Sequence, residues 1–280
     1  MKAGTVALLG RPNTGKSTLV NNLVGQKVSI TSPTPQTTRF PIMAVFEDER
    51  GQIIFVDTPG IFTGRSKQGR SLNIQTEEAL EEQVDVLLYM VDHTRKRGSE
   101  ENRVLGMARK LDIPKILVIN KIDIREPSYL AQYRFMEEEF DAVVEVSALK
   151  GTHLETLFDV IFDNLKEGER IVDRAKMQVP VINIDSRIYM EELIREKAFL
   201  TLRKELPYAI EVKVDELEEK ENDVVYVKAR ILTYPRYKKM VIGHGAHRIK
   251  QIGMMVRKEI EVSTSKRAYV ELTVEAQEKI

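Results

Sequence analysis

Apolar runs of strand length alternate with helix-like segments over the first part of the chain. The strand-like runs lie at 6–9, 41–46, 52–56, 84–91, 115–119 and 142–146, and helical patterns mark 19–24, 98–111, 127–140 and 153–165. Apolar runs of about four to eight residues are typical of strands that are buried on both faces. Their alternation with helices predicts a doubly wound α/β sheet, in which ligands bind where the strands end. The runs at 41–46 and 52–56 form a predicted antiparallel pair, so the sheet is expected to be mixed.

The pattern changes near residue 168. A charged helix is predicted at 187–205, and the segments that follow are two strands, a helix–turn–helix region and a last strand, at 207–217, 224–233, 238–262 and 268–274. This α-β-β-α-α-β order does not continue the first sheet, so it predicts a separate α+β domain. We expect a first domain over 1–170, a linker over 171–186 and a second domain over 187–280.

Composition excludes several classes of protein. The 280 residues include no cysteine, which rules out disulfides and zinc–thiolate sites and fits a reducing cytosol. No apolar run approaches the length of a membrane span, and the first strand begins so close to Met1 that we expect no signal peptide. The formal net charge is zero, so only a local concentration of charge can indicate a polyanionic partner.

The segment Gly10–Thr18 has the pattern G-x-x-x-x-G-K-S and lies between a strand-like run and a helical one. This order of strand, glycine loop and helix is what a phosphate-binding loop requires. The glycines let backbone N–H groups converge on phosphate oxygens at the start of a helix. Lys16 is expected to contact the outer phosphates, and the Ser17 hydroxyl is expected to bind Mg²⁺.

Two further motifs follow predicted strands. Asp57-Thr58-Pro59-Gly60 comes after 53–56, where Asp57 can hold Mg²⁺ and the Gly60 N–H can contact a γ-phosphate. Alone, this motif is more typical of a turn that ends a strand than of a nucleotide site. Asn120-Lys121-Ile122-Asp123 comes after 115–119. A carboxylate at Asp123 can accept hydrogen bonds from the ring N–H and the amine of guanine together, a pair of donors that adenine lacks.

The remaining parts of the predicted site are weaker signals. Ser147-Ala148-Leu149 follows the next strand, and we expect the Ala148 N–H to bind the guanine carbonyl oxygen. The segment 32–39 is rich in proline and hydroxyl groups, which favours an extended switch whose threonine binds Mg²⁺ only when a γ-phosphate is present. Thr38 is preferred to Thr37 for that role, and 61–83 is the predicted second switch. His93 and His153 are isolated and are interpreted as ordinary polar residues.

Taken in order, the motifs GRPNTGKST, PQTTR, DTPG, NKID and SAL resemble those of the Era family of bacterial GTPases. The resemblance implies GTP and GDP as ligands, Mg²⁺ as cofactor and a P-loop GTPase fold. Ile61 stands where Ras-like GTPases have a water-positioning glutamine, which implies slow intrinsic hydrolysis. The resemblance also suggests that Asn13 helps to bind K⁺, although a hydrogen bond that shapes the loop explains Asn13 equally well.

The residues expected to contact the nucleotide are Asn13, Thr14, Gly15, Lys16, Ser17, Thr18, Asp57, Gly60, Asn120, Lys121, Asp123, Ser147, Ala148 and Leu149. Those expected to bind the metal are Ser17, Thr38 and Asp57, and those expected to serve catalysis are Lys16, Asn13, Thr38 and Gly60.

The segment 236–258 carries seven Lys and Arg residues and no acidic residue. It contains the turn Gly243-His244-Gly245-Ala246, and a glycine-rich turn between two helices is how KH modules clamp single-stranded nucleic acid. The order of elements resembles that of a type II KH domain. Ala246 replaces the last glycine of G-x-x-G, and we expect it to tolerate the dihedral angles of a helix start. The predicted RNA-binding residues are Lys238, Lys239, Gly243, His244, Gly245, Ala246, His247, Arg248 and Lys250.

The combined prediction is a GTP-hydrolysing switch whose KH domain binds RNA. The resemblance implies that the RNA is the 3′ end of small-subunit ribosomal RNA and that the process is maturation of the small ribosomal subunit. We expect a cytoplasmic monomer, and peripheral contact with the inner face of the cell membrane stays open. Two alternatives also remain open: a related GTPase of tRNA modification or another pathway, and an RNA chaperone with a regulatory nucleotide site.

Overall fold

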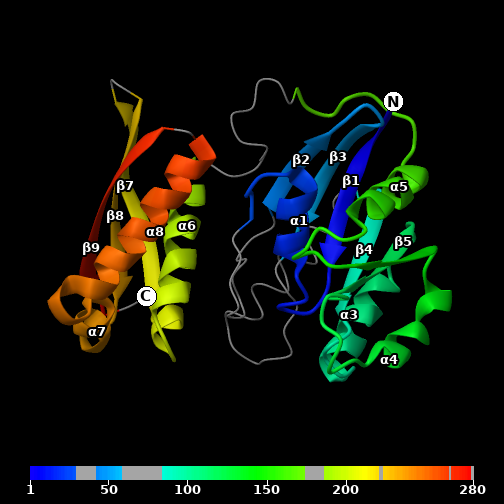
Figure 1. Cartoon of the computed structure of the whole chain (residues 1–280), viewed down its shortest axis with the longest axis horizontal. Helices are drawn as coiled ribbons and strands as arrows, with labels where there is room; N and C mark the ends of the chain where they lie inside the picture. Colours follow the sequence, from blue (N-terminus) through cyan, green and yellow to red (C-terminus); the bar gives the residue numbers. More distant parts are fainter. Residues whose placement is uncertain (30–41, 59–83, 174–185, 221–222, 265, 279–280) are drawn as a thin grey trace. The chain divides into compact units, whose positions relative to one another are not determined.

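The computed structural model of the chain describes residues 1–29, 42–58, 84–173, 186–220, 223–264 and 266–278. These residues divide into two compact units, one up to residue 173 and one from residue 186 (Figure 1). Each unit has its own sheet and its own hydrophobic core. The predicted domain limits at 170 and 187 stay predictions.

A six-stranded sheet in the order β2-β3-β1-β4-β5-β6 forms the centre of the first unit. Its strands are β1 (Lys2–Leu9), β2 (Ile42–Glu47), β3 (Gly51–Asp57), β4 (Val86–Asp92), β5 (Lys115–Asn120) and β6 (Ala142–Val146). β2 pairs antiparallel with β3, and the other neighbouring strands run parallel. The predicted mixed, doubly wound sheet is therefore confirmed, including its one antiparallel pair.

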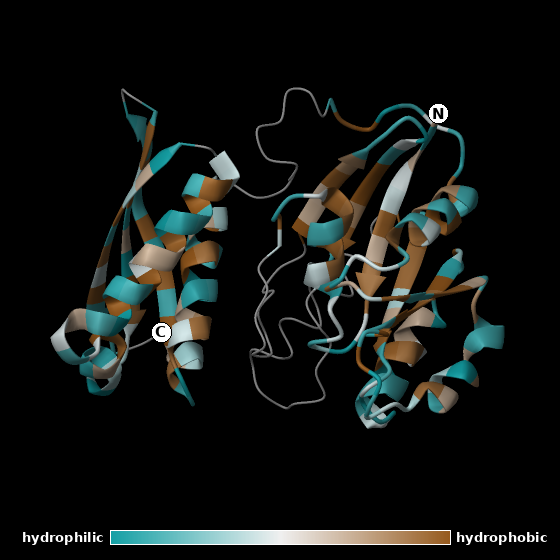
Figure 2. Ribbon diagram, viewed as in Figure 1, coloured by the Kyte–Doolittle hydropathy of each residue, from teal (hydrophilic) through white to brown (hydrophobic). Residues whose placement is uncertain are grey.

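Both faces of this sheet are covered, which explains why consecutive residues of its central strands are apolar. Val86, Leu88 and Met90 of β4 lie in one core cluster, whereas Leu87 and Tyr89 lie in another. In Figure 2 the strands are accordingly brown through the middle of the unit. The helices of the unit are α1 (Lys16–Val24), α3 (Ser99–Ala108), α4 (Leu130–Arg134) and α5 (Leu154–Asn164). Leucines of α1 and α5 pack in the first cluster, and the buried residues of α3 and α4 pack in the second.

One predicted helix is much shorter than expected. The helix predicted at 127–140 appears as α4 (Leu130–Arg134) and a 3₁₀ turn at Glu137–Glu139. Tyr133 and Met136 are buried in the core, but the three glutamates that follow supply no apolar side chain to continue that face. These glutamates form a separate 3₁₀ turn in which no side chain is buried.

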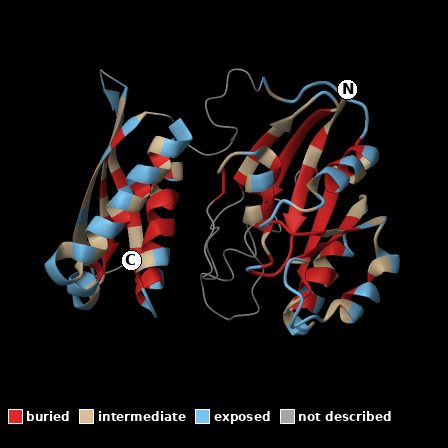
Figure 3. Cartoon of the chain, viewed as in Figure 1, coloured by how far each residue is buried: buried red, intermediate tan, exposed pale blue. Residues whose placement is uncertain are grey.

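The second unit is a three-stranded sheet in the order β7-β8-β9, with helices packed on it. Its elements are α6 (Ser186–Thr201), β7 (Ile210–Lys220), β8 (Val224–Thr233), α7 (Lys238–Ile242), α8 (His247–Thr264) and β9 (Arg267–Ala276), with 3₁₀ turns at Leu206–Ala209, Pro235–Tyr237 and His244–Ala246. β7 and β8 are antiparallel, and β8 and β9 are parallel. The predicted α-β-β-α-α-β order is confirmed. Figure 3 shows that α8 is buried along one side only, where Ile252, Val256 and Ile260 meet the core.

No helix within the described ranges is both long and apolar enough to cross a membrane.

A buried ion pair supports the first unit next to the loop that follows β1. Arg11 is 4% exposed and Glu101 of α3 is fully buried, and Arg11 Nε lies 2.6 Å from Glu101 Oε2. Arg11 Nη2 also donates to the Tyr133 hydroxyl over 2.8 Å, and the Tyr89 hydroxyl donates to Glu101. Burial, reinforced by the charge of Glu101, raises the pKa of Tyr133 to about 12 and that of Tyr89 further. Both tyrosines therefore stay neutral donors in this network.

We expect Glu101→Ala to destabilise the first unit by about 3–5 kcal/mol, because it leaves the Arg11 guanidinium buried without a counter-charge. Native-state hydrogen exchange of the β4 amides measures the change. Glu100→Ala, one residue away on the same helix, removes only a partly exposed carboxylate 3.7 Å from Arg95. It should change stability by no more than about 0.5 kcal/mol. Equal losses in the two variants would contradict the role given to the buried pair.

Candidate functional site

The loop between β1 and α1 takes a conformation that requires glycine at two positions. Gly15 has φ 103°, and a Cβ atom there would lie 2.4 Å from Asn120 Nδ2. A Cβ atom on Gly10 would lie 2.4 Å from the carbonyl oxygen of Met90. Asn13, between them, has φ 62°, a left-handed conformation that asparagine adopts more readily than most residues. The predicted glycine loop is therefore closed tightly against β4 and β5.

Lys16 extends from the start of α1 back along this loop. Its Nζ donates to the carbonyl oxygens of Gly10 and Arg11 over 3.0 and 3.1 Å. The side chain is buried, and the loss of water lowers its pKa to about 8, against the attraction of Asp57 and Glu101. An anion bound in the loop would therefore interact strongly with the Lys16 ammonium, because little water screens the buried charge.

Asp57 at the end of β3 is the residue that best fits a metal ion. It is fully buried, and neither carboxylate oxygen has a hydrogen-bond partner in the described part of the chain. Burial raises its pKa, while Lys16 and the hydroxyls of Ser17 and Ser29 act in the opposite direction. An orphaned carboxylate beside a serine hydroxyl is the oxygen donor set that Mg²⁺ prefers. Thr38 and Gly60, the other predicted ligands of metal and phosphate, lie outside the described residues.

Asn120 links the loops on the base side of the site. Its Nδ2 donates to the carbonyl oxygen of Thr14 over 2.7 Å, and its Oδ1 accepts from the Ala148 N–H over 2.8 Å. Asn120 is 2% exposed, so both bonds are shielded from water. The Ala148 N–H, which we expect to bind the guanine carbonyl oxygen, donates to Asn120 in this structure, and its contact with the base stays a prediction. Asn22 of α1 donates in turn to the Ala148 carbonyl oxygen, which joins the same loop to the first helix.

Asp123 and Lys121 are both held by neighbouring side chains. The Ser147 hydroxyl donates to Asp123 Oδ1 over 2.6 Å and accepts from the Lys150 N–H over 3.1 Å. Lys121 has φ 71°, and its Nζ forms an ion pair of 2.6 Å with the buried Asp92. The structure thus brings the loops after β5 and β6 together, as the sequence predicted, and leaves Leu149 71% exposed between them.

His93 is a residue of this site that sequence reasoning missed. Its Nε2 lies 2.9 Å from the carbonyl oxygen of Lys121, and its Nδ1 lies 3.1 Å from the Ser128 hydroxyl. Since a carbonyl oxygen only accepts, Nε2 carries a proton and donates. The ring is 5% exposed. His93 therefore supports the loop that carries Asp123, instead of being the ordinary polar residue expected. Its position just after a strand was the available signal.

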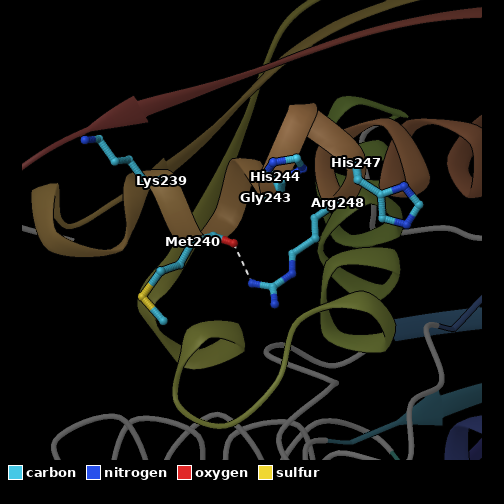
Figure 4. A pocket seen from close by; sticks show the side chains of 6 residues that line it. All are labelled: Lys239, Met240, Gly243, His244, His247 and Arg248. Atoms are coloured by element: carbon cyan, nitrogen blue, oxygen red, sulfur yellow. Dashed lines mark hydrogen bonds between the residues drawn. The ribbon is translucent and has the colours of Figure 1, made fainter.

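The basic turn of the second unit lies between α7 and α8 (Figure 4). Six residues line a pocket there: Lys239, Met240, Gly243, His244, His247 and Arg248. Arg248 Nη1 donates to the Met240 carbonyl oxygen over 2.7 Å, and a Cβ atom on Gly243 would lie 2.9 Å from Arg248 Cγ. Lys239 points away from this bond in Figure 4, and both Lys238 and Lys250 are exposed. The predicted RNA-binding residues therefore lie on one turn and its two flanking helices.

Ala246 does not adopt the conformation expected from the sequence. Its φ is 60°, in the left-handed region, and α8 begins only at His247. Gly245 before it is also left-handed, with φ 56°. A Cβ atom makes this region unfavourable by about 1–2 kcal/mol, so the alanine that replaces the expected glycine strains the turn.

Comparisons with known proteins cover both units. The family model described as 50S ribosome-binding GTPase matches residues 5–121, and the KH domain model matches residues 205–279. The GTPase Era of Halothermothrix orenii is 38% identical over 276 residues, which are 98% of this chain and 92% of that protein. The GTPase Era of Carboxydothermus hydrogenoformans is also 38% identical, over 99% of this chain and 93% of that protein.

Two crystal structures are similar to the whole chain. One is an Aquifex aeolicus Era variant bound to GDP and AlF₄⁻, and the other is Era in complex with MgGDPNP and nucleotides 1506–1542 of 16S ribosomal RNA. Each has a TM-score of 0.90 and 34% sequence identity, and each match covers 100% of this chain and 95% of the other.

We expect His93→Ala to reduce the preference for GDP over IDP, which lacks the guanine amine, by about tenfold, the value of one lost hydrogen bond to the loop. Competition against a fluorescent guanine nucleotide measures both affinities. His93→Gln keeps an N–H donor near Nε2 and should restore the preference. An unchanged preference in His93→Ala would show that the Lys121 carbonyl needs no such support.

We expect Ala246→Gly to stabilise the second unit by about 0.5–1 kcal/mol, because relief of the left-handed strain exceeds the extra entropy of glycine in the unfolded chain. Hydrogen exchange of the α8 and β9 amides measures it. Ala268→Gly is the control, since Ala268 is buried in β9 and its replacement should destabilise the same unit. A loss of stability in Ala246→Gly would contradict the strain.

Proposed function

This chain belongs to the Era family of GTPases, and we propose that it is a GTP-driven switch that binds the 3′ end of small-subunit ribosomal RNA through its second unit. As an Era GTPase it hydrolyses GTP to GDP and phosphate.

The phosphate side of the nucleotide is assigned to the loop Gly10–Thr18. Its backbone N–H groups and the buried Lys16 ammonium would balance the charge of the phosphates. Ser17 and Asp57 are the residues that would hold Mg²⁺, which on binding neutralises charge on the outer phosphate oxygens. Thr38 and Gly60 are proposed to complete this site when GTP is present, and Asn13 is proposed as a ligand of K⁺. Hydrolysis is expected to be slow because Ile61 cannot orient water.

The base side is assigned to the loops after β5 and β6. The Ser147 hydroxyl occupies one oxygen of Asp123, which orients the carboxylate and leaves acceptor capacity for the two N–H groups of guanine. Asn120 holds the Thr14 carbonyl and the Ala148 N–H, so the base-binding loops and the phosphate loop keep one arrangement. Selection of guanine then depends on Asp123.

The RNA side is assigned to the turn Gly243–Ala246 and its flanking cations. The observation that carries the proposal is the match over the whole chain to an Era structure that contains both MgGDPNP and 16S ribosomal RNA. The pocket at this turn supports it, because it is lined by glycine backbone and by Lys239, His247 and Arg248. We further propose that the process is maturation of the small ribosomal subunit, with the cytoplasm as its place. A monomeric state and contact with the membrane stay predictions.

The test is crosslinking of the full chain to cellular RNA with a non-hydrolysable GTP analogue or with GDP, followed by sequencing. We expect the 3′ end of the small-subunit RNA to be recovered about 5–150 times more strongly in one nucleotide state than in the other, the usual range of coupling between two sites. The Asp123→Asn variant, whose site should accept xanthine in place of guanine, should show the same difference with xanthine nucleotides.

Three outcomes would contradict the proposal. Equal recovery of the RNA in both nucleotide states would contradict a role as a switch, although it would not contradict GTP hydrolysis. Recovery of tRNA alone would favour a GTPase of tRNA modification. If Lys16→Ala binds RNA as the unmodified chain does, and the unmodified chain shows no dependence on nucleotide, the protein acts as an RNA chaperone.

A further inference from the structure

A short aromatic turn lies directly before the basic turn of the second unit. β8 ends at Thr233, the 3₁₀ turn Pro235–Tyr237 follows, and α7 then leads to Gly243. The Tyr237 N–H donates to the Tyr234 carbonyl oxygen over 2.9 Å, which closes the turn. Because α7 has five residues, the aromatic turn lies about 7.5 Å along the helix from the glycine turn.

Arg236 is held against both tyrosine rings of this turn. Its Cζ lies 4.6 Å from the centroid of Tyr237 and 5.8 Å from that of Tyr234. The two rings are 6.4 Å apart in an edge arrangement of 72°. Tyr237 is partly buried against the core of the unit, so it gives the guanidinium a fixed support. Such cation–π contacts are worth about 0.5–1 kcal/mol at exposed sites, enough to favour one orientation.

The charge of Arg236 is not balanced by any carboxylate in the described part of the chain. Two other arginines of the same unit are paired, by contrast: Arg230 with Asp215 and Glu275, and Arg257 with Glu261. Arg236 is exposed, and its guanidinium makes cation–π contacts with Tyr234 and Tyr237. No acidic residue occurs between 234 and 258. The guanidinium is thus held close to tyrosine rings, while the Arg236 side chain as a whole is exposed to solvent.

A supported guanidinium of this kind suits an unpaired nucleotide. Unstacked bases bind on arginine planes and aromatic rings, and the N–H groups at the edge of the plane can donate to phosphate. Double-stranded RNA keeps its bases stacked and cannot use the face. A single strand that occupies the turn Gly243–Ala246 needs only to follow α7 to reach Arg236.

We propose that Arg236, supported by Tyr237, is a further RNA subsite that stacks one unpaired base next to the segment bound at Gly243–Ala246. The inference rests on the proposed function, since it needs a single strand at the glycine turn. It adds a stacking site on a different element. Tyr237 is a positioning residue, because it acts through the guanidinium that it supports.

The test compares two substitutions of Arg236, one that keeps its positive charge and one that removes it. Arg236→Lys keeps the positive charge but loses the planar face, and Arg236→Gln loses both. The probe is a fluorescent single-stranded RNA with the sequence of the 3′ end of small-subunit ribosomal RNA, bound to the full chain and followed by anisotropy at several salt concentrations. Arg257→Lys on α8 is the matched control, since that arginine is paired with Glu261.

We expect Arg236→Lys to weaken binding about 5–150-fold, corresponding to the 1–3 kcal/mol of one base stack. The salt dependence should stay unchanged in Arg236→Lys, and its slope should fall by about 0.7 in Arg236→Gln. Tyr237→Leu should weaken binding while leaving the salt dependence unchanged. 2-Aminopurine placed at each position of the probe in turn should lose fluorescence at one position with the unmodified chain and regain it with Arg236→Lys.

Two results separate the possible failures. If Arg236→Lys binds as tightly as the unmodified chain and only Arg236→Gln is weaker, Arg236 contributes charge alone and the stacking subsite is overturned. If the unmodified chain does not bind the probe at all, the proposed RNA function fails, and the subsite fails with it.

Discussion

The nucleotide site depends on one buried amide side chain. Asn120 donates to the backbone of the phosphate loop at Thr14 and accepts from the backbone at Ala148, so it joins three loops that come from β1, β5 and β6. The contact is so close that Gly15 can carry no side chain. A hydrogen bond shielded from water is rigid, and leaving either partner unsatisfied is costly. The phosphate and base halves of the site therefore cannot move independently.

Buried or incompletely paired charges and a strained turn lie where ligands are expected in both units. Asp57 has two buried oxygens without donors in the described part of the chain, and Lys16 has a pKa lowered by burial. In the second unit, Arg236 has no carboxylate partner among the described residues, and Ala246 keeps a left-handed conformation that alanine disfavours. The buried charges of Asp57 and Lys16 and the left-handed Ala246 each cost free energy in the isolated protein. Such costs tend to gather at functional sites, where the ligand or the required geometry offsets them.

Much of the fold could be predicted because local pattern and tertiary environment agree. The central strands of the first unit have runs of consecutive apolar residues because both of their faces are covered, and the ligand motifs follow strand ends because the sheet is parallel there. The prediction of one helix over 127–140 was wrong in extent, because α4 ends at Arg134 and the glutamates form a separate 3₁₀ turn with no buried side chain. The conformation predicted for Ala246 was wrong because a single sequence does not show which residue of a turn takes a positive φ.

The sequence by itself determined which groups can do chemistry: a lysine and a serine after a glycine loop, carboxylates at strand ends, and a run of cations around a glycine turn. Only the tertiary structure decided how these groups are held. His93 and Lys121 lie 28 positions apart, and Arg11 and Tyr133 lie 122 apart, yet each pair is hydrogen-bonded. Periodicity reports burial along one element, whereas hydrogen bonds between elements depend on how the chain brings distant residues within about 3 Å of each other.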